Sequence, residues 1–156
     1  MLDKAIGGVF HPGSTFKLFV YLAALRSGMT PQSMIADTPI NEGSYRPKNS
    51  GLRYRGDITL EKAFAQSSNV AAVRLYQKVD GKEVEKAAQD LGIRSPLTLD
   101  QSLALGSSGV TLLELTAAYA AVANDSLPIS ISVKANNYEP TLYAFDIETY
   151  NKDSSN

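Results

Sequence analysis

The sequence predicts a mainly α-helical chain with a short β tail. Apolar stretches of helical length recur between residues 15 and 123, and several begin at a serine or threonine that can cap a helix. After Asn124 the character changes, because "PISISV" alternates apolar and polar residues and "TLYAFDIETY" is rich in residues that favour strands. The expected order is therefore helices first and then a small amount of sheet.

Size, charge and composition narrow the classes of function. With 156 residues, 44% of them hydrophobic, the chain can bury one modest core and is expected to be one domain or a piece of one. The formal net charge is −1 and both signs are spread along the sequence, so no nucleic-acid partner is expected. Cysteine is absent and His11 is the single histidine, so we expect no disulfide, no metal site and no cofactor.

Two further observations concern membranes and targeting. The longest apolar stretch, Leu18 to Leu25, is far too short to span a bilayer, so no membrane segment is expected in this chain. The first residues, "MLDKAIGG", lack both the basic start and the apolar run of a signal peptide. If the protein works outside the cytoplasm, its targeting segment is expected to lie outside this sequence.

Caps and stops locate the helices. Ser14 can cap the first helix, and Gly28 follows its end, where a left-handed residue is wanted. Thr59 can cap the second helix, and Thr111 with Glu114 forms a capping box before the last one. Helices are expected at residues 15–26, 60–66, 70–79, 82–91 and 112–123.

Two interruptions separate these helices. Residues 28–56 are dense in Pro, Gly, Asn and Ser and are expected to form an extended loop region, so strands are expected mainly after residue 128. Farther along, the pair Ser67 and Ser68 breaks a helical stretch, and Asn69 begins the next helix. Side chains at such a break can reach into a cleft.

Ser14 and Lys17 share one turn at the start of the first helix. Their spacing of three residues places both side chains on the same side of the helix. A serine hydroxyl needs a neighbouring base to become a nucleophile, and an amine held against apolar neighbours such as Phe16 and Phe19 loses proton affinity. The alternative is a helix cap followed by a lysine that extends its charged end to solvent. The two residues alone leave both interpretations open.

A second pair, Ser67 and Asn69, stands in an S-x-N arrangement at the helix break. An S-x-x-K motif followed by a serine–asparagine motif resembles the signature of the transpeptidase domain of bacterial penicillin-binding proteins, in particular the bifunctional high-molecular-weight class. The similarity extends through the sequence around both motifs, in the order of the family, from about Ala5 to Asn124. It is carried by "PGSTFKLFVYLAAL", "YRPKNSGLRYRGDITLEKAFAQSSNVAAVRL" and "LGSSGVTLLELTAAYAAVAN".

The resemblance implies catalytic roles for four residues. Ser14 would attack a D-alanyl-D-alanine stem peptide of peptidoglycan, or a β-lactam ring, to form an acyl-enzyme. Lys17 would take the proton of the Ser14 hydroxyl. Ser67 would relay a proton toward the leaving group, and Asn69 would orient Lys17 and bind the substrate amide. The alternative for Ser67 and Asn69 is a pair of helix caps. No substrate-binding residues can be assigned beyond these.

The sequence departs from the family in one motif. No lysine is followed by Thr-Gly or Ser-Gly, so the K-T-G or K-S-G strand is missing. The resemblance therefore implies a mainly α fragment of the α/β penicillin-binding-protein and β-lactamase-like transpeptidase fold. Residues 1–124 would be its helical part, and residues 125–156 are expected to be a β tail, with an insertion or a junction as the alternatives. The parent protein would act outside the cytoplasm at the cell membrane.

Three functional interpretations follow. The first is a partial D,D-transpeptidase domain that is weak or inactive alone. The second is a non-catalytic remnant of the fold or an interaction module. The third rests on Asp146 and Glu148, whose D-x-E spacing resembles the first metal-binding motif of 3′–5′ exonucleases. Residues two apart on any strand face the same way. An exonuclease also needs two further carboxylate motifs, and the given sequence ends within ten residues of this one, so the third interpretation is the least favoured.

Overall fold

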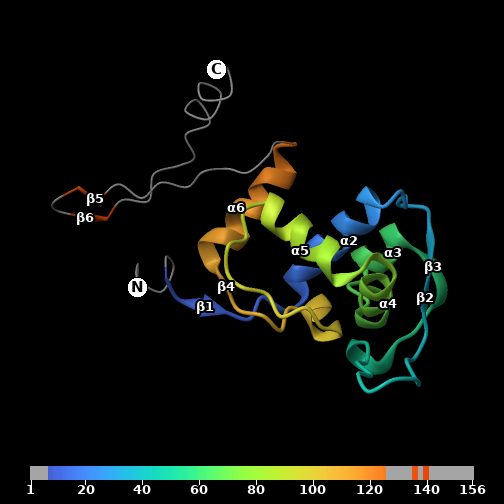
Figure 1. The fold of residues 1–156 in the computed structure, drawn as a ribbon. Helices are drawn as coiled ribbons and strands as arrows, with labels where there is room; N and C mark the ends of the chain where they lie inside the picture. Colours follow the sequence, from blue (N-terminus) through green and yellow to red (C-terminus); the bar gives the residue numbers. More distant parts are fainter. Residues whose placement is uncertain (1–6, 126–134, 137–138, 141–156) are drawn as a thin grey trace. The chain divides into compact units, whose positions relative to one another are not determined.

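The computed structural model describes residues 7–125, 135–136 and 139–140 (Figure 1). These residues divide between two compact units. The larger unit comprises His11–Ala87 and Pro96–Gly109. The smaller unit contains the remaining described residues. Helix α5, Gly81–Asp90, begins in the larger unit and ends in the smaller one.

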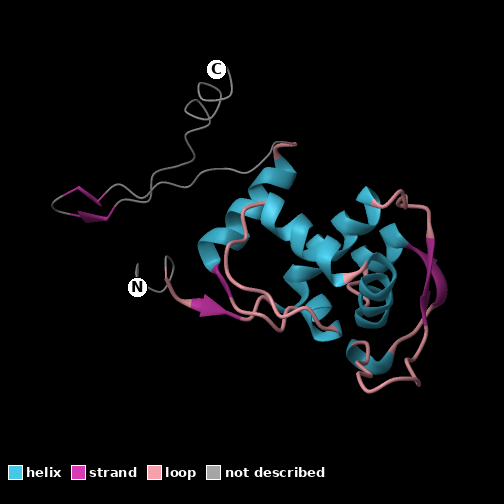
Figure 2. Ribbon diagram, in the orientation of Figure 1, coloured by secondary structure: helices cyan, strands magenta, loops and turns pink. Residues whose placement is uncertain are grey.

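The larger unit combines helices, short 3₁₀ turns and one β-hairpin (Figure 2). Strands β2 and β3 pair antiparallel, with Met34 opposite Thr59 and Asp37 opposite Gly56. Its elements are η1 (Gly13–Phe16), α2 (Lys17–Arg26), β2 (Met34–Asp37), η2 (Ser50–Leu52), β3 (Gly56–Thr59), α3 (Leu60–Ala65), α4 (Asn69–Val79) and η3 (Gln101–Leu105).

Helices α2 and α4 pack together at the core of the larger unit. Helix α2 is apolar on nearly every face, which is typical of a helix surrounded by protein. Phe16 and Phe19 are completely buried, and their rings meet edge to face with centroids 4.9 Å apart. Truncating either ring to alanine is expected to cost about 3–5 kcal/mol, because the lost contacts leave a cavity. The start of α2 is therefore held rigidly.

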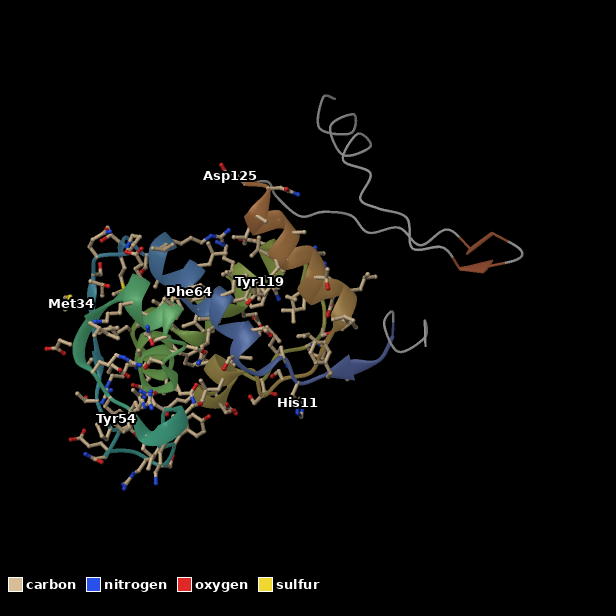
Figure 3. The ribbon with its side chains drawn as sticks, turned by 180° about the vertical axis from the view of Figure 1, so that it is seen from behind. His11, Met34, Tyr54, Phe64, Tyr119 and Asp125 are labelled. Atoms are coloured by element: carbon tan, nitrogen blue, oxygen red, sulfur yellow. The ribbon has the colours of Figure 1, made fainter. Side chains whose placement is uncertain are left out.

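The periphery of this unit leaves some apolar side chains at the surface. Met34 on β2 is 53% exposed and Phe64 on α3 is 44% exposed (Figure 3). The Phe64 ring covers Tyr21 of α2, with centroids 5.0 Å apart. The hydroxyl of Tyr21 is buried without a hydrogen-bond partner, and burial together with the charge of Asp37 raises the pKa of that hydroxyl.

The expectation of an extended loop region at residues 28–56 is wrong in part, and among the described residues strands do not lie mainly after residue 128. The segments "MIAD" and "GDIT" form the β2–β3 hairpin, and each buries one isoleucine, Ile35 and Ile58, opposite each other. Strands of four residues that contain Gly and Asp give almost no alternating pattern. Their stability comes from pairing across a long connection, which local sequence does not reveal.

The predicted helices are confirmed, with ends shifted by a few residues. Thr59 caps α3 by accepting a hydrogen bond from the Lys62 N–H, as expected. The break at the serine pair is also confirmed, because Ser68 caps α4. The expected cap at Ser14 is wrong: a 3₁₀ turn precedes α2, its N-cap residue is Phe16, and no side chain caps it.

In the smaller unit, a two-residue ladder joins β1 (Val9–Phe10) to β4 (Val110–Thr111), and α6 (Leu112–Ala123) follows. The predicted capping box between Thr111 and Glu114 is present. The Glu114 carboxylate also accepts hydrogen bonds from the Arg94 N–H at 2.7 Å and the Ser95 N–H at 2.8 Å. Burial opposes its ionisation, but these hydrogen bonds prevail and hold the pKa of Glu114 below its usual value.

The described tail residues form the short pair β5 (Ala135–Asn136) and β6 (Glu139–Pro140). The strands predicted from "PISISV" and "TLYAFDIETY" lie outside the described residues. Within the described ranges, no helix combines the length and the apolar character that crossing a membrane requires.

Candidate active site

Lys17 is the first residue of α2, and its side chain is buried although it carries a charge. Only 2% of it is exposed. Its Nζ donates three hydrogen bonds: to the Ser67 carbonyl at 2.7 Å, to the Ser67 hydroxyl at 2.9 Å and to Asn69 Oδ1 at 2.7 Å. An ammonium group has three donors, so every donor of Lys17 is satisfied. A buried cation is tolerable only under such conditions.

Burial lowers the pKa of Lys17 from 10.5 to about 8. The cause is desolvation, which disfavours the charged form of an amine. A group with a pKa near the working pH can both accept and return a proton, which is the property that a general base requires. The expected loss of proton affinity at Lys17 is therefore present in the structure.

Ser67 links α3 to α4 in an unusual backbone conformation. Its φ is +52°, in the left-handed region that residues with a side chain seldom adopt. Such a conformation costs about 1–3 kcal/mol and persists only where its surroundings enforce it. It lets both the carbonyl and the hydroxyl of Ser67 accept hydrogen bonds from Lys17. The strained backbone of Ser67 thus belongs to the same arrangement as its two hydrogen bonds from Lys17.

Asn69 is half-buried at the first position of α4. Its Oδ1 accepts a hydrogen bond from Lys17, and its Nδ2 donates one to the Lys48 carbonyl at 2.8 Å. A donor on one side and an acceptor on the other fix which way the amide points. The arrangement agrees with the orienting role that the resemblance implies for Asn69.

Ser14 lies in η1, one turn before Lys17, and is exposed. The Lys17 backbone N–H donates a hydrogen bond to the Ser14 carbonyl. Within the described residues, the Ser14 hydroxyl makes no hydrogen bond to the Lys17 ammonium, whose donors are directed to Ser67 and Asn69. The structure therefore brings three of the four expected residues into direct contact and leaves the fourth one turn away, with its hydroxyl open to solvent.

The turn that carries Ser14 is packed against a second glycine-containing turn. Gly13 has φ +59° and Gly106, which ends η3, has φ +76°. A Cβ atom added at Gly106 would collide with the backbone N and O of Gly13. Two backbones can approach this closely only where no side chain intervenes. The sequence gives only a weak signal of this contact, the first glycine in "LGSSG".

Sequence reasoning missed that three polar residues at the Ser67–Asn69 turn, two of them packed against it and one within it, are buried. Asp37 is completely buried, Asn49 is 7% exposed and Ser68 is 2% exposed. Ser68 could have been found from its capping position. Asp37 and Asn49 lie in the stretch expected to be a polar loop, where nothing in the sequence marks them as buried.

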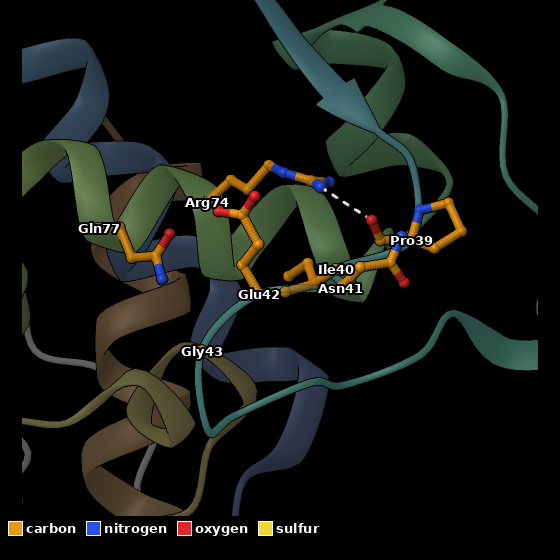
Figure 4. Close-up of a pocket in the computed structure, with 7 residues that line it drawn as sticks. All are labelled: Pro39, Ile40, Asn41, Glu42, Gly43, Arg74 and Gln77. Atoms are coloured by element: carbon orange, nitrogen blue, oxygen red, sulfur yellow. Dashed lines mark hydrogen bonds between the residues drawn. The ribbon is translucent and has the colours of Figure 1, made fainter.

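A polar hollow of about 460 Å³ lies elsewhere on the larger unit and contains none of the expected site residues (Figure 4). Arg74 lines it and donates hydrogen bonds to the carbonyls of Ala36 at 2.9 Å, Thr38 at 2.6 Å and Pro39 at 3.2 Å. Its guanidinium group is therefore engaged in holding the chain after β2. The hollow is lined by Pro39, Ile40, Asn41, Glu42, Gly43, Arg74 and Gln77.

The sequence singled out Asp146, Glu148 and His11 as the residues to consider for metal binding. Asp146 and Glu148 lie outside the described residues. Among the residues that the structure describes, no three metal-ligating side chains of His, Asp or Glu gather into a group. His11 is exposed just before η1 (Figure 3).

Comparison with known proteins identifies relatives of the chain. A family model described as the penicillin binding protein transpeptidase domain matches residues 1–149. Penicillin-binding protein 1A of Neisseria gonorrhoeae is 35% identical over 145 residues, which cover 88% of this chain and 18% of that protein. Penicillin-binding protein 1A of Rickettsia typhi is 35% identical over 128 residues, 78% of this chain and 16% of that protein. The chain thus spans about a sixth of the length of these relatives.

Solved structures agree with the sequence relatives. The crystal structure of penicillin-binding protein 1A from Haemophilus influenzae matches with a TM-score of 0.72 and 31% identity, over 86% of this chain and 20% of that one. PonA1 from Mycobacterium tuberculosis, solved in complex with penicillin V, matches with a TM-score of 0.69 and 23% identity, over 74% of this chain and 35% of that one. These matches confirm the expected fold. Because the family model covers nearly the whole sequence, the chain belongs to the penicillin-binding protein transpeptidase family.

Proposed function

We propose that this chain is the helical part of a D,D-transpeptidase domain that cross-links peptidoglycan through an acyl-serine intermediate. The observation that carries the proposal is the buried Lys17 ammonium, which Ser67 and Asn69 hold one turn from the exposed Ser14 hydroxyl. A helix cap with a solvated lysine, the alternative interpretation, does not account for a lysine that is 2% exposed. The parent protein would act outside the cytoplasm at the cell membrane.

The proposed reaction begins when the Ser14 oxygen attacks the carbonyl carbon of a stem-peptide D-alanyl-D-alanine or of a β-lactam. Lys17, after losing a proton, accepts the proton of the Ser14 hydroxyl. An ester forms at Ser14 as the carbon–nitrogen bond breaks, and the proton passes to the leaving nitrogen. The 2.9 Å hydrogen bond between Lys17 Nζ and the Ser67 hydroxyl supports a relay from Lys17 through Ser67.

The missing strand motif sets the expected activity of the chain alone. In the family, the K-T-G strand binds the substrate carboxylate and borders the oxyanion site. Losing one oxyanion donor costs about 10²–10³ in rate, and losing the group that holds the ring in place has a cost of similar or larger size. The isolated chain is therefore expected to react with penicillin at least about a thousandfold more slowly than a complete domain.

A time course with fluorescent penicillin tests this function. Slow covalent labelling is expected in the chain as given, none in Ser14→Ala, and unchanged labelling in Ser44→Ala, a control at an exposed serine. Labelling that persists in Ser14→Ala would contradict the assigned nucleophile. Rapid stoichiometric labelling of the isolated chain would contradict its expected weakness. No labelling of either the chain or Ser14→Ala would favour the non-catalytic remnant.

A further inference from the structure

A buried carboxylate lies beneath the turn that holds Lys17. Asp37, at the end of β2, is completely buried. Its Oδ1 accepts hydrogen bonds from the Ser68 hydroxyl and from Asn49 Nδ2, both at 2.6 Å. Its Oδ2 accepts one from the Arg55 backbone N–H at 3.1 Å and lies 3.7 Å from the Arg55 guanidinium. Three hydrogen-bond donors and one guanidinium group therefore contact the carboxylate, which offsets the cost of burying it.

Asn49 connects the buried Asp37 carboxylate to the start of α4 through hydrogen bonds to both. Its Oδ1 accepts the backbone N–H groups of Asn69 at 2.9 Å and Val70 at 3.1 Å. Its Nδ2 donates to Asp37, which decides which end of the amide faces the helix. The hydroxyl of Ser68 accepts the next N–H group, that of Ala71, at 3.1 Å. The network thus satisfies three N–H groups of the first turn, which have no partner within the helix.

The same network borders both groups that bind Lys17. Ser68 stands between Ser67 and Asn69 in sequence, so fixing its side chain fixes the backbone on either side. The residue before Asn49 supplies the Lys48 carbonyl that receives Asn69 Nδ2 at 2.8 Å. None of the hydrogen bonds from Asp37 or Asn49 reaches Lys17 itself; their partners are the turn and its supports.

We infer that Asp37 and Asn49 are positioning residues, whose buried side chains hold the Ser67–Asn69 turn in the geometry that accepts three hydrogen bonds from Lys17. The strained φ of +52° at Ser67 supports this role, since such a conformation needs enforcement by its surroundings. The consequence for catalysis rests on the proposed function. The effect on Lys17 does not, because the contacts exist whether or not Ser14 reacts.

The competing explanation is that the network only stabilises the fold, as any helix cap does. Thr59→Ala provides the matched control, because Thr59 caps the neighbouring helix α3 through a single 3.2 Å hydrogen bond to the Lys62 N–H. The test variants are Asn49→Ala and Asp37→Asn. Asn49→Ala removes the side chain that connects Asp37 to α4. Asp37→Asn keeps the side-chain volume but places an NH₂ group next to hydrogen-bond donors, so hydrogen bonds are lost. If Asn49→Ala does not fold, Asp37→Asn carries the test.

The measurement is the rate at which the Lys17 amine is acetylated by acetic anhydride, followed by mass spectrometry of the chain. The urea concentration is chosen for each variant so that all variants have the same free energy of unfolding, which circular dichroism measures. The acetylation rates are then compared under these conditions. Without the hydrogen bonds of Asp37 or Asn49, the turn is expected to release Lys17 more often. Acetylation of Lys17 is therefore expected to be at least about tenfold faster in Asn49→Ala and Asp37→Asn than in Thr59→Ala. Equal rates in all three variants would overturn the inference.

Penicillin labelling of Ser14 supplies a second measurement. The two network variants are expected to label at least about tenfold more slowly than Thr59→Ala. If the unmodified chain does not label at all, the proposed function fails, yet the acetylation of Lys17 still decides whether Asp37 and Asn49 position the turn. If labelling is normal in both network variants while Lys17 becomes reactive, the positioning holds but acylation does not depend on it.

Discussion

The Lys17 side chain is harder to protonate in the folded chain than in the unfolded chain. Burial lowers the pKa of Lys17 from 10.5 to about 8, so the unfolded chain binds this proton more tightly than the folded chain does. Stability therefore rises with pH wherever the unfolded state still holds the proton and the folded state has released it. That window extends from about pH 8 to 10.5.

Urea unfolding between pH 7 and 11 tests this expectation. The free energy of unfolding is expected to increase by about 2 kcal/mol between pH 8 and pH 10. Above pH 10 it is expected to fall again, because burial raises the pKa of Tyr21 and Tyr119 and the unfolded chain then ionises first. In Lys17→Met the rise from pH 8 to 10 should disappear. If the free energy of unfolding of Lys17→Met still rises between pH 8 and 10, a titratable group other than Lys17 causes the rise.

The same pKa predicts how acylation depends on pH. If neutral Lys17 is the base, about one-tenth of the chain is competent at pH 7, and the labelling rate should increase about tenfold toward pH 9 and then level off. Initial rates of penicillin labelling, corrected for the spontaneous hydrolysis of the drug, measure this profile. A flat profile, or one that bends near 10.5, would be incompatible with Lys17 as the base.

The packing of elements around Ser14 depends on two glycines whose backbones touch. Gly106 closes η3 against Gly13, the first residue of η1, and both have positive φ. Gly43 offers a comparison, since its φ of +78° nearly equals the +76° of Gly106 but a Cβ atom there would meet nothing within 4 Å. A side chain would therefore be strained by the left-handed backbone at both sites, but its Cβ atom would collide with other atoms only at Gly106.

Alanine substitutions at these two glycines separate strain from collision. Gly43→Ala is expected to destabilise the chain by about 1 kcal/mol, the cost of a left-handed alanine. Gly106→Ala is expected to cost about 2 kcal/mol more, because its Cβ forces η1 away from η3, and it should also slow the labelling of Ser14. Urea unfolding and penicillin labelling measure the two effects. Equal destabilisation at both positions would show that the contact is loose.

Elements with local signals were predictable from the sequence, and those that depend on distant pairing were not. The cap at Thr59 and the box at Thr111 and Glu114 involve residues three apart, so their patterns are visible in the sequence. The β2–β3 hairpin joins segments about twenty residues apart, and its strands are too short to show alternation. Ser14 was mistaken for a cap because a 3₁₀ turn and a capped helix start look alike in sequence.

The candidate site divides in the same way. Lys17, Ser67 and Asn69 were expected because the resemblance supplied their roles, and the structure brings them into contact. Asp37 and Asn49 were missed, since a buried carboxylate in a stretch rich in Pro and Gly looks like an ordinary loop residue. Burial is a property of the folded chain, and polar residues gain it only through partners that the sequence does not identify.

For the molecule as a whole, the chain carries the proposed nucleophile Ser14 but spans 18% of a relative such as penicillin-binding protein 1A of Neisseria gonorrhoeae. A chimera in which this chain replaces the matching 145 residues of that protein tests whether the rest completes the site. The chimera is expected to label with penicillin at least about a thousandfold faster than the isolated chain, and not at all with Ser14→Ala. A chimera that folds but labels no faster than the isolated chain would contradict the proposal that the K-T-G strand, supplied by the relative, is what the labelling reaction lacks.

Arg74 makes one stretch of the surface intolerant of a change in length. Its guanidinium group gathers the carbonyls of Ala36, Thr38 and Pro39, so an added residue there would pull at least one carbonyl out of reach. Residues 41–44, which follow at once, are all exposed. A peptide tag inserted after Gly43 should therefore leave the unfolding midpoint in urea nearly unchanged, whereas the same tag after Thr38 should lower it sharply. The neighbourhood of Gly43 is thus a place to attach a reporter to this domain.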